Sequence, residues 1–330
     1  MRIRRRAAAA STRSFRCLSC LKDSSDRKRW ALEYFHSDMH LTPPSGTALA
    51  DQRPSSFAEG VLLEVAYDGT GFSGWAAQRE ARTVEETLRG AVVSMDPRAG
   101  PPRGASRTDA GVHAEKQLVA FDASRSIPAR GWVLGLNQHL PSDVAVRSAR
   151  AVPVGYAPRF SARSKRYRYR VLVDSVRDPC WRTRAWRVND LDVAAMTREA
   201  AGALGTHDFA SFRASADRRT NTVRTLTRVQ IERETDARIV AVVVEGDGFL
   251  HNMVRILVGT LVDVARGRLA EGTIPRALAE RSRGAAGTTA PSMGLVLEEV
   301  DVVLPADAGE RWPSAPDSAD RGCFGHRAVR

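Results

Sequence analysis

The residues best suited to chemistry lie in one nine-residue stretch, residues 106–114, which reads S-R-T-D-A-G-V-H-A. It holds a cation (Arg107), a carboxylate (Asp109) and an imidazole (His113) within seven positions. In extended backbone, residues two apart project from the same face, so Arg107 and Asp109 can share one substrate. Gly111 lets the chain turn tightly and lets another segment approach closely. This pattern suits a phosphate-bearing substrate on which the carboxylate acts as base or nucleophile.

Other interpretations of the same residues, including purely structural ones, stay open at this point. Arg107 and Asp109 can cap backbone groups of a loop, and His113 can be a packing residue. A metal-dependent hydrolase built on Asp109, His113 and His251 is a second interpretation, but a second carboxylate and a paired-ligand spacing are missing from the sequence. A third is a protein that binds RNA without catalysis.

Composition favours a polyanionic partner. The chain has 330 residues, a net charge of +12 and a pI of about 10.3, which points to nucleic acid. Nearly all of its positive charge is arginine, which suits bidentate phosphate contacts and stacking on bases. Cys17 and Cys20 form a C-x-x-C, but no second pair completes a zinc site, so we expect neither a metal nor a disulfide framework. No apolar run is long enough for a membrane span, and a soluble, intracellular protein is expected.

Four regions differ in character along the chain. Residues 1–57 are predicted to be a disordered basic leader, since residues 1–22 hold seven basic side chains and no acidic one. This composition is typical of a mitochondrial or plastid transit peptide, whereas an RNA-binding arm or a misassigned start codon would leave the protein cytoplasmic. Residues 58–152 and 153–304 are predicted as an N-terminal half that carries the catalytic loop and a C-terminal half, each mixing strands and helices. Residues 305–330 are predicted to be a disordered tail.

The hydrophobic pattern places the catalytic candidates among regular elements. Strands are predicted at 61–68, 117–121, 144–146, 160–171, 223–231, 239–245 and 295–303. Helices are predicted at 132–140, 193–204 and 275–281. A further helix is predicted to begin at a capping box made by Thr83 and Glu86. The last predicted helix includes Leu250 and ends at Gly267. Residues 166–171 alternate strictly, which predicts a strand with an arginine face (Arg166, Arg168, Arg170) and an aromatic and aliphatic face that includes Tyr167 and Tyr169.

Taken in order, several motifs resemble the tRNA pseudouridine synthase A family. The family signature R-T-D-x-G-V-H-A matches residues 107–114, and its aspartate is catalytic in that family. Further matches are F-S-G-W at 72–75, G-L-N-Q-H-L-P-S-D-V-A-V at 135–146 and M-V-R at 253–255. The resemblance covers about three quarters of the chain, residues 61–303. One departure is Ala76, which stands where the family has glutamine.

The resemblance implies both a fold and a function. The fold would be α+β, with two α/β halves sharing a continuous mixed, mainly antiparallel β-sheet flanked by helices, around a basic central cleft. The function would be isomerisation of uridine to pseudouridine in the anticodon stem-loop of tRNA, at positions 38, 39 and/or 40, without cofactor or metal. The partner would be tRNA, and a homodimer is expected.

The resemblance also implies roles for single residues. Asp109 would be the catalytic carboxylate, and Arg255 would keep it ionised, since burial disfavours an unpaired charge. Arg107 would fill the space left by a flipped nucleotide or hold its phosphate. The substrate uracil would stack on Tyr167, between apolar walls formed by Phe249 and Leu295. We expect His113 and His251 to pack around the site rather than to act as acid or base.

Overall fold

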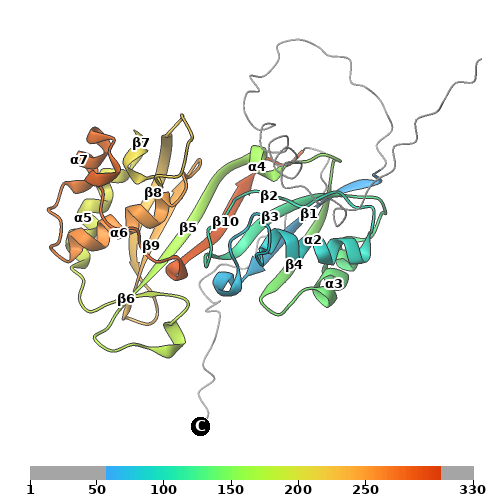
Figure 1. Cartoon of the computed structure of the whole chain (residues 1–330), viewed down its shortest axis with the longest axis horizontal. Helices are drawn as coiled ribbons and strands as arrows, with labels where there is room; N and C mark the ends of the chain where they lie inside the picture. The colour runs from blue at the N-terminus through green and yellow to red at the C-terminus, as the bar shows by residue number, and fades with distance from the viewer. Residues whose placement is uncertain (1–56, 306–330) are drawn as a thin grey trace, which may run out of the picture. The chain divides into compact units, whose positions relative to one another are not determined.

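The structure is a computed structural model, and it describes residues 57–305 (Figure 1). The predicted leader and tail therefore fall almost wholly outside the described residues. The described chain is built on one ten-stranded sheet, in which the strands run in the order β4-β1-β3-β10-β5-β9-β8-β7, with β2 beside β3 and β6 beside β5. The strands are β1 (Glu59–Tyr67), β2 (Arg103–Gly104), β3 (His113–Ala123), β4 (Val144–Val152), β5 (Ala162–Val173), β6 (Trp186–Val188), β7 (Gly205–Asp208), β8 (Val223–Arg233), β9 (Ile239–Gly246) and β10 (Leu295–Val302).

Strand β10 is the last in the chain but lies in the middle of the sheet. It pairs in parallel with β3, where Val296 is opposite His113, and antiparallel with β5, where Leu297 is opposite Tyr167. The pairing of β6 with β5 is also parallel, and every other pairing is antiparallel. The segment before β3, which carries Asp109, is thereby brought next to β5.

Helices pack beside both ends of the sheet. In Figure 1, α2 (Val84–Met95) and α3 (Ala129–His139) lie beside β1 and β4, and α5 (Val193–Ala200), α6 (Met253–Ala265) and α7 (Thr273–Glu280) lie beside β8 and β9. A short helix, α4 (Pro158–Ser161), precedes β5. Fully buried aromatic rings anchor the packing, such as Trp132 of α3, which meets Phe121 of β3 edge-on at 5.1 Å. The predicted α+β class, with a mixed and mainly antiparallel sheet flanked by helices, is confirmed.

The start of α2 corrects one prediction. Thr83 is the N-cap residue, but its side chain caps no backbone group, and Glu86 pairs with Arg89 instead of completing a capping box. The backbone N–H groups of Val84 and Glu85 donate to the carbonyls of Gly74 and Trp75, as the chain leading to the helix folds back on it. Tertiary contacts have replaced the local cap that the sequence predicted.

Helix α6 also begins later than predicted. It starts at Met253, because Asn252 has a left-handed backbone (φ 61°) that interrupts the helical pattern. Leu250 is buried, but it lies in the turn before the helix. The predicted stop at Gly267 is confirmed by its φ of 67°.

The alternation of β5 is confirmed, but its arginine face is not free positive charge. Arg166 forms ion pairs with Glu245 and Glu299, at 2.9 and 3.0 Å. The next arginines along the strand meet carboxylates in the same way: Arg168 pairs with Glu232, Glu234 and Glu298, and Arg170 with Glu234. Of these glutamates, Glu232 lies on β8, Glu234 just after it, Glu245 on β9, and Glu298 and Glu299 on β10. The neighbouring strands therefore neutralise the arginine face.

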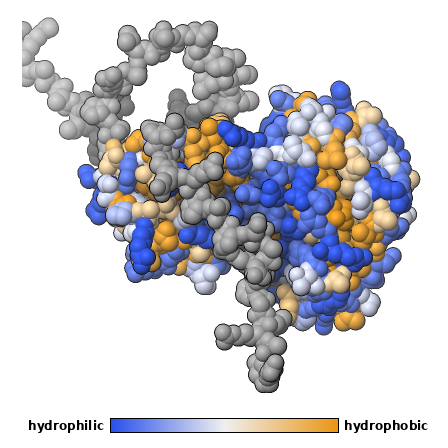
Figure 2. Space-filling model, turned by 180° about the vertical axis from the view of Figure 1, so that it is seen from behind, coloured by the Kyte–Doolittle hydropathy of each residue, from blue (hydrophilic) through white to orange (hydrophobic). Residues whose placement is uncertain are grey.

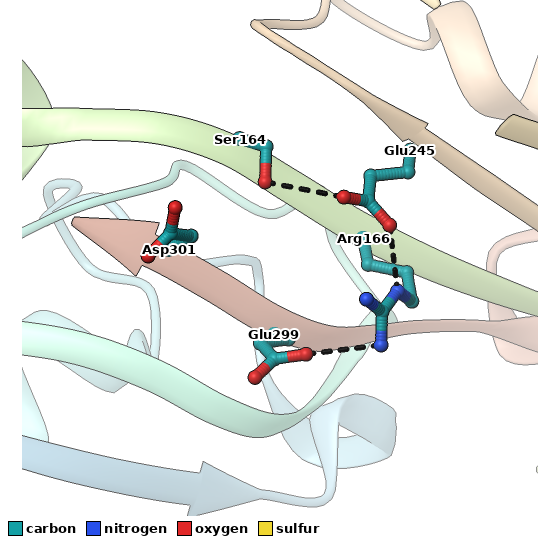
Figure 3. Close-up of a pocket in the computed structure, with 5 residues that line it drawn as sticks. All are labelled: Ser164, Arg166, Glu245, Glu299 and Asp301. Atoms are coloured by element: carbon teal, nitrogen blue, oxygen red, sulfur yellow. Dashed lines mark hydrogen bonds and ion pairs between the residues drawn. The ribbon is translucent and has the colours of Figure 1, made fainter. Parts of the chain in front are cut away.

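A pocket on this face shows the same balance of charge. It is lined by Ser164, Arg166, Glu245, Glu299 and Asp301, and Figure 3 shows the guanidinium of Arg166 between the two glutamates. Viewed from behind, hydrophilic residues gather across the middle of the molecule (Figure 2). Three carboxylates against one guanidinium make this pocket unsuited to a phosphate group.

Candidate active site

The segment between β2 and β3 that carries Asp109 is held through its backbone. The amide side chain of Gln117 brackets Ser106, as its Oε1 accepts the Ser106 N–H at 3.1 Å and its Nε2 donates to the Ser106 carbonyl at 2.6 Å. Lys165 of β5 donates from Nζ to the carbonyl of Ala105 at 2.9 Å. We call residues 105–112 the catalytic loop. Its first residues are thus fixed from both β3 and β5.

Two buried tyrosines hold the hydroxyl groups of the same loop. The Tyr67 hydroxyl lies 2.7 Å from Thr108 Oγ1, and the Tyr167 hydroxyl lies 2.9 Å from Ser106 Oγ. Burial raises the pKa of Tyr167 to about 12; its bond to Ser106 opposes the shift and the charge of Asp109 adds to it. Burial raises the pKa of Tyr67 as well. Both phenols are therefore neutral at physiological pH.

The turn after Asp109 requires a glycine. Gly111 has a φ of 77°, and a Cβ atom there would lie 2.6 Å from the Ser292 hydroxyl oxygen. The Gly111 N–H donates to the carbonyl of Phe72, and the Val112 N–H donates to the carbonyl of Asp109. The turn thus packs against the segment before β10 while presenting the Asp109 side chain.

The Asp109 carboxylate lies between two side-chain nitrogen atoms. Arg255 Nη1 lies 3.4 Å from Oδ2, and His251 Nε2 lies 3.4 Å from Oδ1. The carboxylate side chain is 24% exposed and that of Arg255 is 18% exposed, so this ion pair is largely shielded from water. Arg255 is fixed in turn, since its Nε donates to the Ala290 carbonyl and its Nη1 to Asn252 Oδ1, both at 2.8 Å. A fixed guanidinium next to a carboxylate balances its negative charge.

The structure also brings two of the other predicted site residues together. The rings of Tyr167 and Phe249 meet edge-on at 5.1 Å, with Tyr167 buried and Phe249 half-buried. Leu295 is buried at the start of β10, where it pairs with Tyr169 rather than Tyr167. The residue opposite Tyr167 on β10 is Leu297, which the sequence analysis did not single out.

Arg107 is exposed on the catalytic loop. No hydrogen bond or ion pair of its side chain is seen with residues 57–305. Its predicted contact with a nucleotide stays a prediction.

His113 makes no direct contact with Asp109 and is buried at the start of β3. The Gly69 N–H donates to its Nδ1 at 3.1 Å, so Nδ1 is an acceptor, and Nε2–H donates to the Thr183 carbonyl at 2.8 Å. Burial lowers the pKa of His113, and the nearby carboxylate of Asp68 only partly offsets this. Asp68 also pairs with Arg184 at 2.8 Å. His113 and Asp68 therefore bind the loop that carries Thr183 and Arg184.

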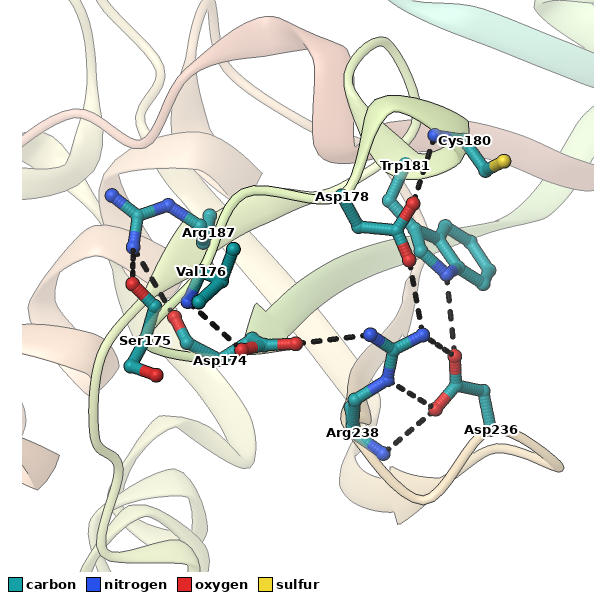
Figure 4. Close-up of polar contacts among 9 residues, drawn as sticks. All are labelled: Asp174, Ser175, Val176, Asp178, Cys180, Trp181, Arg187, Asp236 and Arg238. Carbon is teal, nitrogen blue, oxygen red and sulfur yellow. Dashed lines mark hydrogen bonds and ion pairs between the residues drawn. The ribbon is translucent and has the colours of Figure 1, made fainter.

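That loop, between β5 and β6, is anchored at its other side by Arg238. In Figure 4 the Arg238 guanidinium points at three carboxylates, those of Asp174, Asp178 and Asp236, at 2.8 to 3.0 Å. The indole N–H of Trp181 donates to the same Asp236 at 3.3 Å. The β8–β9 turn is thus linked through this loop to the segments that support the catalytic loop.

His251, Lys165 and Gln117 are site residues that the sequence analysis missed or undervalued. The alternation of β5 contained a signal for Lys165, since it lies two positions before Tyr167 and hence on the same face. His251 was expected to pack around the site, but no periodicity predicted its contact with Asp109, because it lies in an irregular turn before α6. Gln117 lies four residues into β3, where only the tertiary structure shows what it faces.

Metal sites and membrane spans are two further features to consider in the described residues. Among residues 57–305, no group of three or more His, Cys, Asp or Glu side chains could hold a metal ion. None of the helices in this range combines the length and apolar character needed to span a membrane.

Comparison with known proteins places the chain in a family. Residues 64–161 and 200–301 match the family model described as tRNA pseudouridine synthase. A tRNA pseudouridine synthase A from Acetivibrio thermocellus is 41% identical over 241 residues, which cover 73% of this chain and 98% of the relative. Proteins of the same name from Halalkalibacterium halodurans and Myxococcus xanthus are 44% and 42% identical, over 71% and 72% of this chain and 89% and 90% of theirs. The chain belongs to the tRNA pseudouridine synthase A family.

Proposed function

We propose that Asp109 is the essential carboxylate with which this tRNA pseudouridine synthase converts uridine to pseudouridine, and that its target uridines lie in the anticodon stem-loop, at positions 38, 39 and/or 40. The observation that carries the proposal is the placement of Asp109 against Arg255, in a loop whose other end is bonded to Tyr167. A shielded carboxylate, a fixed cation and an aromatic ring meet at one place.

The reaction can be performed by side chains alone. The bond from ribose C1′ to uracil N1 breaks, a bond from C1′ to C5 forms, the C5 proton leaves and N1 gains a proton. Nothing is oxidised and no group is imported, so no cofactor or metal is needed for the balance. Asp109 acts either as a nucleophile on the ribose or as a base, and the positive charge of Arg255 faces it in both cases.

The remaining site residues are proposed to hold a flipped nucleotide. A base stacked in an RNA stem is unreachable, so it must leave the stack before it reacts. The flipped uracil stacks on the ring of Tyr167, which is buried against the half-buried Phe249, and Leu295 adds an apolar wall. Arg107, exposed beside Asp109, holds the phosphate of the flipped nucleotide or fills the space that it leaves.

The RNA is proposed to bind on the face of β5 that carries Tyr167, in a basic cleft. Burial lowers the pKa of Lys165 to about 8, and repulsion from Arg159, Arg219 and Arg224 adds to this shift. Cations are therefore concentrated around Lys165 on the Tyr167 face, whereas the opposite face of β5 is neutralised by glutamates. A phosphate backbone favours the first face.

Three further properties are proposed on the sequence and family alone. Residues 58–152 and 153–304 act as the two halves of the enzyme, which works as a homodimer. The leader, residues 1–57, directs the protein to a mitochondrion or plastid; without such targeting the enzyme is cytoplasmic. A fluorescent fusion of residues 1–57 tests the targeting, since diffuse cytoplasmic signal would contradict it.

The position of the target uridines can be tested directly. The purified enzyme is incubated with tRNA transcripts that keep a single uridine of the anticodon stem-loop, at position 38, 39 or 40, and pseudouridine is mapped in each. We expect modification of at least one of these transcripts, with and without EDTA. Pseudouridine only at sites outside the anticodon stem-loop would contradict the target assignment, and tight binding without any pseudouridine would favour an RNA-binding protein without catalysis.

A further inference from the structure

His251 brings the second side-chain nitrogen to Asp109, and the mechanism above does not use it. Its Nε2 lies 3.4 Å from Oδ1, while Arg255 approaches the other oxygen, Oδ2. A nitrogen at this distance from a carboxylate oxygen is attractive only if it bears a proton. An imidazole carries a proton on Nε2 in its neutral Nε2–H tautomer and in the imidazolium.

The backbone, not the imidazole, fixes His251 in its turn. Its N–H donates to Asp217 Oδ2 at 3.0 Å, and its carbonyl accepts from the Ala214 N–H at 2.9 Å. Asp217 stays ionised, since hydrogen bonds from Arg219 and the His251 N–H outweigh burial and lower its pKa to about 2. The next residue, Asn252, has a left-handed backbone and holds Arg255 through its side chain. The turn thus aims both Arg255 and His251 at one carboxylate.

The imidazole itself is 46% exposed, in contrast to the shielded Arg255. It can exchange protons with water while it contacts Asp109. The charged groups around it come from three elements: Asp109 of the catalytic loop, Arg255 of α6, and Asp217 with Arg219 of the segment before β8. Of these, Asp217 is already paired with Arg219, so the charge of His251 acts mainly on Asp109.

We propose that His251 is a positioning residue for Asp109, which it holds as a neutral donor in the active enzyme, and that its protonation to imidazolium lowers activity. A neutral N–H orients Oδ1 without competing for its charge. An imidazolium forms a second ion pair with the carboxylate, which then has both oxygens engaged by cations and is a weaker nucleophile or base. This inference rests on the proposed role of Asp109.

The test is the pH dependence of single-turnover pseudouridine formation at saturating enzyme, from pH 5.5 to 8.5. We expect the native rate to fall on the acid side of this range, where imidazole gains its proton. His251→Gln keeps a neutral N–H donor, so we expect a rate within about threefold of native at pH 8 and no acid decline. His251→Leu removes the donor, and we expect about a tenfold lower rate at pH 8, also without the acid decline.

Controls separate this role from a merely structural one. The His251 side chain bonds no backbone group within residues 57–305, so both variants are expected to keep the native melting temperature and tRNA affinity. His139→Gln, an exposed histidine at the end of α3, should keep the native profile. An acid decline that persists in His251→Gln, or a native rate in His251→Leu, would overturn the proposal. Activity of Asp109→Asn would contradict the proposed role of Asp109, whereas the results for the His251 variants test the role of His251 alone. The failure of one proposal is therefore distinguishable from the failure of the other.

Discussion

At the residue scale, the site depends on Asp109 and Arg255, which are 146 positions apart. The sequence could suggest this pair for two reasons. An arginine among the apolar residues of a helix needs an oppositely charged partner, and both residues lie in motifs shared with the family. It placed His251 around the site but could not suggest its contact with Asp109. That contact depends on the left-handed turn at Asn252, which no periodicity reveals.

Replacing Arg255 tests the pair. Arg255→Leu removes the cation that faces Asp109 and leaves the Ala290 carbonyl without its donor. We expect destabilisation by roughly 2 kcal/mol and near-complete loss of activity, because a partly buried carboxylate is then uncompensated. Denaturant unfolding and single-turnover assays measure the two effects.

The matched control is Arg276→Leu, whose side chain is exposed on α7 and pairs with Glu280 one turn away. An exposed pair of this kind contributes less than about 0.5 kcal/mol, so little change is expected. Equal stability and activity in the Arg255 and Arg276 variants would show that Arg255 has no special role.

Lys165 gives the fold a pH dependence of stability. Its pKa is lowered by burial, and by Arg159, Arg219 and Arg224, from 10.5 to about 8. Between these pH values the unfolded chain binds one more proton than the folded chain, so this group makes stability rise with pH, and its contribution is lost as pH falls through 8. Lys165→Met should remove a rise of roughly 2 kcal/mol between pH 8 and 10. Native and variant unfolding curves that run parallel over this window would contradict the shift.

At the scale of elements, the sequence predicted the longer strands and helices, but it missed the short elements β2, β6, β7 and α4 and did not show what each element faces. The alternation of β5 could be predicted because it repeats every two residues within one short segment of the sequence. The glutamates that neutralise its arginines come from β8, β9 and β10, and their alignment is a property of sheet register. The same limit explains the absent capping box at Thr83, where the chain before α2 supplies the contacts.

Arg107 of the catalytic loop and Arg168 of β5 are predicted to have different roles. Arg107→Gln removes an exposed charge of the catalytic loop, and we expect weaker tRNA binding and a smaller dependence of log Kd on log salt, by about one unit of slope. Arg168→Gln removes a charge that Glu232, Glu234 and Glu298 already engage, so tRNA affinity should stay within about twofold while thermal stability falls. Binding titrations at several salt concentrations decide this. The reverse pattern, with Arg168 controlling affinity, would place the RNA on the other face of the sheet.

At the scale of the whole described chain, the decisive feature is the position of β10. The last strand lies between β3 and β5, so it joins strands that are distant in the chain and brings the catalytic loop to Tyr167. The sequence predicted a final strand at 295–303 but held no sign of its place in the sheet, because pairing between distant segments leaves no local pattern. The link from His113 and Asp68 to the Arg238 loop is equally long-range.

The central claim is that Asp109 performs the chemistry, and the most direct measurement is pseudouridine formation by Asp109→Asn and Asp109→Ala beside native enzyme on the same tRNA. Asp247→Asn, an exposed carboxylate outside the site, serves as the matched control. We predict no detectable pseudouridine from either Asp109 variant, with tRNA affinity within about threefold of native, and normal product from the Asp247 variant. Turnover by Asp109→Asn or Asp109→Ala at a rate comparable to the native enzyme would contradict the account.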